Sequence, residues 1–127
     1  MSKFVVDASA ILALLNQENG SENIAQLIDN AIISSVNLSE VIAKLADAGI
    51  IEDDIQKILS SLNIEVVSFN QEQGFIAGML RPSTKPIGLS FGDRACLALG
   101  IYLGLPVLTT DRLWANLNLE IEIQVIR

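Results

Sequence analysis

The sequence predicts an α/β fold in which a parallel β-sheet lies between two layers of helices. Two observations lead to this prediction. Stretches with the composition of strands alternate with stretches of helical periodicity along the chain. The fourth predicted strand, at residues 106–110, is an apolar run without alternation, which is typical of a strand buried on both faces. The chain has 127 residues, 50% of them hydrophobic, and we expect residues 1–127 to form a single domain.

The first half of the chain is predicted to hold two strands and four helices. Apolar spacing, turn residues and helix caps define each one. In order, they are a strand at residues 4–6, a helix at 10–15, a helix capped by Ser21, a strand at 31–35, a helix that stops at Gly49 and a helix at 51–62.

The second half is predicted to hold three strands, two helices and one long loop. Two prolines and a glycine between Arg81 and Ser90 predict the loop. In order, the elements are a strand at residues 64–69, a helix opened by Asn70 that ends before Pro82, the loop at 81–90, an apolar helix from Ser90 to Gly104, a strand at 106–110 and a strand within 119–126.

Composition limits the chemistry that this chain can perform. It has no histidine and one cysteine, so catalytic sites that need histidine and metal sites made of histidine or several cysteines are excluded. Any bound metal must take oxygen ligands, which favours Mg²⁺, Mn²⁺ or Ca²⁺. The formal net charge of −7 disfavours general, non-specific binding to nucleic acid.

Neither a membrane span nor a signal peptide is expected. The longest uncharged stretch, residues 95–110, has 16 residues and contains Gly100, Gly104 and Pro106. A bilayer span needs roughly 20 apolar residues. Asp7 interrupts the apolar stretch near the first residue, which argues against a signal peptide. We therefore expect an intracellular, cytoplasmic protein.

Two aspartates follow predicted strands. Asp7 comes directly after the first strand and Asp111 directly after the fourth. In parallel α/β sheets, ligands bind beyond the carboxyl ends of the strands, so both side chains are candidates for an active site. Aspartate is also a preferred N-cap, and either residue could simply cap the helix that follows it.

Two further acids lie on predicted helices. Glu40 is outside the apolar stripe of its helix, where it could form an ion pair with Lys44 four residues later. Asp93 follows Ser90 by three residues, the spacing of a capping box. Asp93 and Arg94 are nevertheless the only charges in an otherwise apolar helix, so a role in a site stays open.

Four sequence motifs resemble those of the PIN-domain ribonucleases, and among these the VapC-type toxins of bacterial and archaeal toxin–antitoxin modules. Together they extend over most of the chain, from Phe4 to Trp114. The motifs are VVDASAILALL at residues 5–15, NLSEV at 37–41, LSFGDRA at 89–95 and LTTDR at 108–112. The resemblance implies a single PIN-like domain with a five-stranded parallel sheet between helices.

The resemblance also implies an activity, that of an endoribonuclease dependent on Mg²⁺ or Mn²⁺ that leaves a 5′-phosphate and a 3′-hydroxyl. The residues that match the family's acidic cluster, as catalytic residues and metal ligands, are Asp7, Glu40, Asp93 and Asp111. Ser9 and Thr109 match its supporting polar positions. Carboxylates that converge without countercharges repel one another and favour a bound cation, which can activate water as the nucleophile.

Basic residues are concentrated near the third and fourth motifs. Residues 81–112 hold four basic and two acidic side chains, in a chain that is acidic elsewhere. This local excess could bind the phosphates of RNA, although scattered surface charge would give the same pattern. The RNA-binding candidates are Arg81, Lys85, Arg94 and Arg112.

The resemblance to toxins implies protein partners. An antitoxin segment would cross the site, its arginine paired with the acids and its apolar anchors near Ile11, Leu14 and Leu15. A homodimer is also expected, since the helices within residues 21–62 carry more isoleucine and leucine than one thin domain needs.

Other functions compete with the toxin hypothesis. A PIN fold could serve only as a docking module, or as an RNA-processing nuclease without a toxin role. A phosphatase that forms an aspartyl-phosphate on Asp7 normally has a second aspartate two residues later, where this chain has Ser9. A receiver domain needs an acidic pair near the start of the chain, and Asp7 stands alone there.

Overall fold

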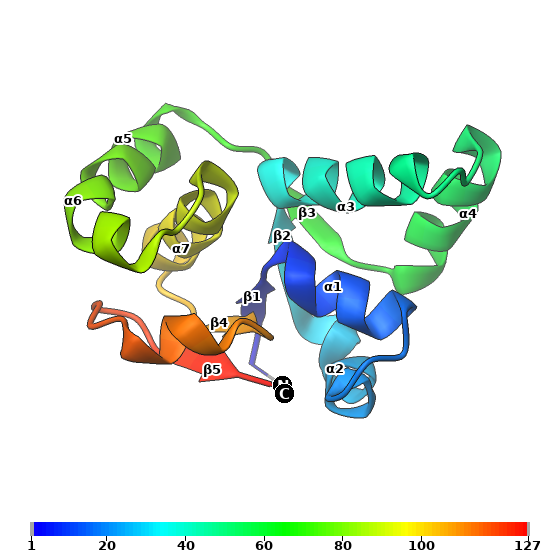
Figure 1. Ribbon diagram of the computed structural model, residues 1–127, viewed down its shortest axis with the longest axis horizontal. Helices are drawn as coiled ribbons and strands as arrows, with labels where there is room; N and C mark the ends of the chain where they lie inside the picture. The colour runs from blue at the N-terminus through cyan, green and yellow to red at the C-terminus, as the bar shows by residue number, and fades with distance from the viewer. Residues whose placement is uncertain (1, 127) are drawn as a thin grey trace.

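The computed structural model describes residues 2–126 and holds a five-stranded, wholly parallel sheet of order β3-β2-β1-β4-β5 (Figure 1). The strands are β1 (Phe4–Val6), β2 (Ala31–Ser34), β3 (Glu65–Val67), β4 (Val107–Thr109) and β5 (Ile123–Val125). The predicted α/β class and parallel sheet are confirmed. The central position of β1 places the residue that follows it between two neighbouring strand ends.

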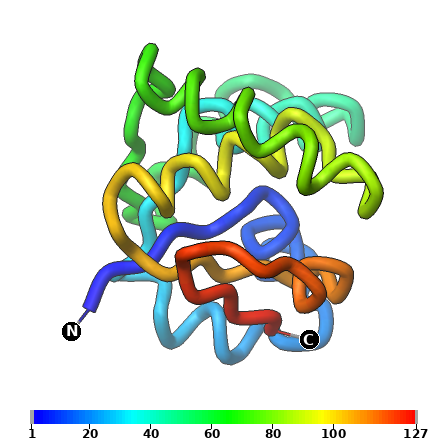
Figure 2. The backbone as a smooth tube through the Cα atoms, turned by 90° about the vertical axis from the view of Figure 1, so that its left-hand side faces the viewer, coloured from blue at the N-terminus to red at the C-terminus, as the bar shows by residue number. Residues whose placement is uncertain are grey.

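Helices cover both faces of the sheet, with α1 to α4 on one side and α5 to α7 on the other (Figure 1). The tube view of Figure 2 shows α5 running along α7, against which it packs. The helices are α1 (Ala8–Leu15), α2 (Ser21–Leu27), α3 (Ser35–Asp47), α4 (Glu52–Leu62), α5 (Gln71–Met79), α6 (Arg81–Thr84) and α7 (Phe91–Leu103). Short 3₁₀ turns lie at Ile28–Asn30, Lys85–Ile87 and Arg112–Asn116. Within residues 2–126, none of these helices has the length and apolarity to cross a membrane.

The sheet separates two hydrophobic cores, because successive strand residues point to opposite faces. Val6 and Ile33 pack with α1 and α3 in one core, whereas Val5, Ile32 and Val107 pack with α7 in the other. All residues of β1, β2 and β4 are buried. Burial on both faces explains why these strands are apolar runs in the sequence.

Several helix boundaries are set by the local signals that the sequence contains. Asn70 caps α5 by accepting from the backbone N–H of Gln73 (3.0 Å). Ser90 caps α7 in a complete capping box, and Gly104 ends that helix in the left-handed conformation with φ +68°. Helix α3 likewise ends just before Gly49, as predicted.

The structure corrects several predicted elements, among them the start of α2, the end of β2 and the loop at 81–90. Gly20, with φ +89°, is the N-cap of α2, and Ser21 is already the first helical residue. Ser34 ends β2 and caps α3, so the predicted strand is too long at its end. The predicted loop at 81–90 contains α6 and a 3₁₀ turn. Prolines at 82 and 86 stand in the first turn of each one. Proline is suited to that position, because its φ is fixed near the helical value and its missing N–H is not needed there.

Candidate active site

Asp7 connects the central strand β1 to helix α1. Its carboxylate caps α1 by accepting from the backbone N–H of Ala10 (2.9 Å). It also accepts hydrogen bonds from the hydroxyls of Ser9 (2.8 Å) and Thr109 (2.5 Å). The side chain is 4% exposed. The N-cap role considered for Asp7 is thus confirmed, and the capping carboxylate is at the same time the centre of a buried polar network.

Burial raises the pKa of Asp7 to about 6, from 3.8 for an exposed aspartate. Loss of hydration is the main cause. The hydrogen bonds from Thr109, Ala10 and Ser9 lower the pKa, and the charge of Asp93 raises it. Asp7 is therefore ionised at neutral pH at an energetic cost that a nearby cation would remove.

Three hydroxyls support Asp7, that of Ser9 on α1 and those of Thr109 and Thr110 at the carboxyl end of β4. The Thr109 hydroxyl donates to Asp7 and accepts from the backbone N–H of Asp111 (3.0 Å). The Thr110 hydroxyl donates to that of Ser9 (2.9 Å), which in turn donates to Asp7. Ser9 and Thr109 were predicted in these positions, whereas Thr110 was missed, although its place beside Thr109 after a buried strand was the available signal.

Glu40 lies on α3 and faces the first turn of α7. It forms no ion pair with Lys44, which corrects that alternative. It accepts instead from the side-chain nitrogen of Asn37 (2.8 Å), which also donates to the carbonyl oxygen of Gly92 (2.9 Å). The Glu40 carboxylate packs so tightly against Gly92 that a Cβ atom at position 92 would overlap it. Asn37, which the sequence analysis missed, therefore ties Glu40 to the residue next to Asp93.

Asp93 stands in the first turn of α7. Its carboxylate accepts from the backbone N–H of Ser90 (2.9 Å), and the Ser90 hydroxyl accepts from the backbone N–H of Asp93 (3.2 Å). The capping box is therefore real. Asp93 is also near enough to Asp7 for its charge to raise the pKa of that side chain.

The buried thiol of Cys96 lies within electrostatic reach of three of the predicted acids. Its pKa is raised well above the usual value, mainly by burial and then by the charges of three carboxylates. These are Asp7, Asp93 and Glu40, which come from β1, α7 and α3. The charges of all three acids therefore act on one buried side chain, although the acids are far apart in the sequence.

Asp111 occupies a more peripheral position. It caps the 3₁₀ turn that follows β4 by accepting from the backbone N–H of Leu113 (3.0 Å). Together with Ser9, Thr110 and Arg112 it lines an open pocket of ≈ 480 Å³. Its charge is not among those that raise the pKa of Asp7 or Cys96.

The arrangement of the acids suits a cation that keeps several water ligands better than a cation coordinated only by protein side chains. Among residues 2–126, no three His, Cys, Asp or Glu side chains have the spacing of a metal site. Mg²⁺, however, is commonly held by one or two carboxylates together with waters and substrate phosphates. Asp7, whose ionised form is destabilised by burial, and Asp93, whose charge raises the pKa of Asp7, are carboxylates of this kind. Which of the predicted acids are ligands stays a prediction.

The four predicted RNA-binding residues are in different environments. Arg112 lines the pocket beside Asp111, and Arg81 and Lys85 are exposed near the end of α5. Arg94 instead donates to the backbone carbonyl of Ala77 on α5 (2.9 Å). Its guanidinium also lies over the ring of Phe91, 5.8 Å from the centroid. Arg94 thus holds α7 to α5.

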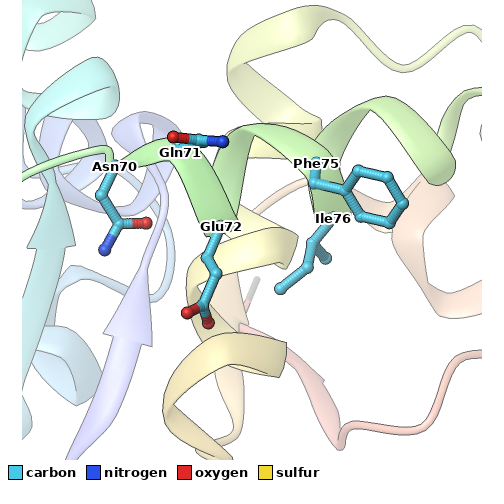
Figure 3. A pocket seen from close by; sticks show the side chains of 5 residues that line it. All are labelled: Asn70, Gln71, Glu72, Phe75 and Ile76. Carbon is cyan, nitrogen blue, oxygen red and sulfur yellow. The ribbon is translucent and has the colours of Figure 1, made fainter.

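A second hollow, of ≈ 610 Å³, lies on the surface of α5. Figure 3 shows the side chains that line it, and none of the predicted acids is among them. They are Asn70, Gln71, Glu72, Phe75 and Ile76. Because one helix and its cap supply the whole lining, the acidic end of β1 remains the better candidate for an active site.

One known protein family matches most of the chain. The sequence model of the PIN domain family matches residues 4–118. No curated protein sequence is significantly similar to this chain.

Solved structures share the fold at low sequence identity. A DNA-bound VapBC complex from Salmonella typhimurium contains a chain with a TM-score of 0.77 and 20% identity, and the alignment covers 100% of both chains. VapBC2 from Rickettsia felis, bound to a DNA fragment from its promoter, matches with a TM-score of 0.75 and 17% identity over 98% of each chain. A toxin–antitoxin complex from Klebsiella pneumoniae gives a TM-score of 0.74 and 16% identity over 91% of this chain and 92% of that one.

Proposed function

The chain belongs to the PIN domain family, and we propose that it is an endoribonuclease dependent on Mg²⁺ or Mn²⁺ that serves as the toxin of a toxin–antitoxin pair. The observation that carries the proposal is the buried Asp7 carboxylate at the end of β1, which accepts from the hydroxyls of Ser9 and Thr109 and has its pKa raised in part by the charge of Asp93. A buried carboxylate with a raised pKa beside a second acid is typical of a functional site.

The chemistry proposed here uses no side chain as nucleophile, in keeping with a chain that lacks histidine. A bound divalent cation would supply positive charge to the scissile phosphate and an activated water. Asp7 and Asp93 would hold that cation, with Glu40 oriented toward it by Asn37. Ser9 and Thr109 keep the Asp7 carboxylate in one orientation. Hydrolysis by water is proposed to leave a 5′-phosphate and a 3′-hydroxyl.

Arg112 is the basic residue best placed to hold the substrate. It lines the pocket that also contains Ser9 and Asp111, and Ser9 contacts Asp7 directly. We propose that its guanidinium binds a backbone phosphate next to the cleaved one, with Arg81 and Lys85 further along the strand. Arg94 has no such role in this proposal, because its guanidinium is committed to Ala77 and Phe91.

Protein partners are proposed from the resemblance to toxins and from the fold. VapBC complexes contain chains of this fold, and an antitoxin is the partner proposed here. A homodimer is proposed as well, but its apolar surface differs from the expected one. Among the exposed large hydrophobic residues, Ile51 lies within residues 21–62, while Phe75 and Met79 on α5 are 72% and 65% exposed. Most apolar residues of helices α3 and α4 pack in or against the hydrophobic core instead.

Cleavage of a mixed RNA pool by the purified chain tests the nuclease function. We expect cleavage with Mn²⁺ or Mg²⁺, none with EDTA, and none by the Asp7→Asn variant with either metal. Asp53→Asn is the matched control, because Asp53 is an exposed acid in the first turn of α4 and should be dispensable. Cleavage that persists in EDTA, or in Asp7→Asn, would contradict the proposal. The absence of any cleavage by the wild type would favour a docking module.

A further inference from the structure

The contact between α3 and α7 contains two residues, Asn37 and Gly92, whose positions are not explained by hydrophobic packing. We propose that Asn37 and Gly92 are positioning residues, which fix the Glu40 carboxylate against the first turn of α7 so that acids of both helices reach one cation. This inference rests on the proposed function. Neither residue would touch the metal or the RNA, and both act through Glu40.

Asn37 is placed to serve two acceptors with one nitrogen. It lies three residues before Glu40, on the same side of α3, and is 1% exposed. Its side-chain nitrogen donates to Glu40 (2.8 Å) and to the carbonyl oxygen of Gly92 (2.9 Å). Both partners can only accept, so the amide has one satisfactory orientation. A serine or threonine hydroxyl, with a single proton, could not make both bonds.

This arrangement leaves the other end of the amide unsatisfied. The side-chain oxygen of Asn37 is buried and accepts no hydrogen bond from any group of residues 2–126. An unpaired buried acceptor destabilises the folded protein, and an apolar side chain of the same shape would avoid it. The amide is therefore poorly explained by stability alone, and its two bonds across the α3–α7 contact supply the missing reason.

Gly92 makes the complementary contribution from α7. Glycine is less favourable than alanine inside a helix, and Gly92 is in the first turn of an otherwise regular one. Its Cα atom faces the Glu40 carboxylate, which occupies the space that a Cβ atom would need. A side chain at position 92 would therefore push Glu40 away from Asp93, the next residue.

Two variants with matched controls test the role of this contact. Asn37→Leu removes both hydrogen bonds and keeps the number and branching of the side-chain heavy atoms, and Gly92→Ala displaces Glu40. Gln73→Leu is the control for the first, because Gln73 is also a fully buried amide with an unpaired oxygen, and its nitrogen bonds only the carbonyl of Ser68. Gly78→Ala is the control for the second, because a Cβ atom at position 78 of α5 meets nothing within 4 Å.

The main readout is the affinity for Mn²⁺ without RNA, measured from the rise in melting temperature during a Mn²⁺ titration. We expect Asn37→Leu and Gly92→Ala to bind Mn²⁺ at least about tenfold more weakly than the wild type, the size of effect seen for residues that orient metal ligands. Gln73→Leu and Gly78→Ala should keep the wild-type affinity, whatever happens to their melting temperatures in EDTA. Wild-type affinity in both test variants would overturn the inference.

A metal-free measurement separates this inference from the proposed function. If the wild type shows no response to Mn²⁺, the proposed function fails, and the contact is judged by a double-mutant cycle in EDTA. The cycle compares Asn37→Leu, Glu40→Leu and the double variant. A double variant that loses less stability than the two single losses combined supports the coupling of Asn37 to Glu40. Additive losses overturn it.

Discussion

The carboxyl ends of β1 and β4 start from the same sequence pattern and reach different environments. At both ends an aspartate follows a buried strand and caps the helical turn after it. Asp7 is buried against α1 and accepts from the Thr109 hydroxyl of β4, and burial with the charge of Asp93 raises its pKa to about 6. Asp111 is half-buried in an open pocket beside Arg112. Both aspartates cap a helical turn, and they differ in how deeply the side chain is buried.

The position of each strand explains this difference. Strand β1 has β2 and β4 as neighbours, so the residue after it lies under elements from both sides. Strand β4 has the edge strand β5 as its outer neighbour. Asp111 also comes two residues after the end of β4, where the chain already leaves the sheet. An acid at the centre of the sheet loses its hydration, and one near the edge keeps it.

The largest expected effect is the loss of activity in Asp7→Asn. We expect RNA cleavage to fall by more than about a hundredfold, because even groups that only orient a metal ligand change metal affinity by 10–100-fold. The same variant should be more stable than the wild type in EDTA at pH 7, because a costly buried charge is removed. Cleavage assays and thermal unfolding measure the two effects. A variant that is both inactive and less stable would indicate a structural role for this carboxylate.

The pH dependence of stability sharpens the comparison further. The folded-state pKa of Asp7, about 6, lies above the unfolded value of 3.8, so the folded protein holds the extra proton between these values. The stability linked to Asp7 is therefore present at low pH and is lost as the pH rises through about 6. This shift corresponds to about 3 kcal/mol between the two limits.

Chemical denaturation in EDTA from pH 4 to pH 7.5 measures this dependence. The difference in unfolding free energy between Asp7→Asn and the wild type should grow with pH over that range. Parallel curves for wild type and Asp7→Asn would mean that Asp7 has an ordinary pKa in the folded protein.

Substitutions of Asp111 should have smaller effects. Asp111→Asn should reduce cleavage by about tenfold or less, the low end for groups that influence a metal site indirectly. Its stability should be unchanged, because asparagine caps a helix as well as aspartate does. Asp111→Ala should in addition lose about 1 kcal/mol, since the hydrogen bond to Leu113 is removed. If Asp111→Asn were as inactive as Asp7→Asn, the two strand ends would be equivalent in function.

The smallest effect is expected for Arg112→Gln. Loss of one phosphate contact should raise KM a few-fold and leave kcat unchanged. The slope of log affinity against log salt concentration should become shallower by about 1. Lys57→Gln is the control, because Lys57 is an exposed base on α4. A fall in kcat at constant KM would place Arg112 in the reaction and not in substrate binding.

Much of the fold and part of the site follow from short-range signals. Ser90 and Asp93 are three residues apart, and their capping box forms within one helical turn. Apolar strands predict burial on both faces wherever the chain places them. The motif acids were therefore assigned to the correct elements. Ser9, which the resemblance gave as a supporting residue, contacts Asp7 two residues away.

Other features depend on residues that are distant in the sequence. Asn37 contacts Gly92 across 55 residues, and no local pattern around either one indicates the other. Arg94 was a candidate for RNA binding in the sequence, but α5 packs close enough to offer it the carbonyl of Ala77. The helical turns at 81–90 were missed because proline both breaks helices and starts them, and the packing around the segment decides which.

The sequence by itself determined the α/β class, the parallel sheet and most of the elements, because these depend on periodicity and on caps within one turn. The set of acids stays a prediction from motifs of a few residues. Only the tertiary structure decided which acid is buried, which arginine is held between two helices and what contacts Glu40. Hydration and hydrogen bonding at each carboxylate are set by the atoms that surround it in space. Those atoms come from β4, α3 and α7, and the chain brings them together only when it folds.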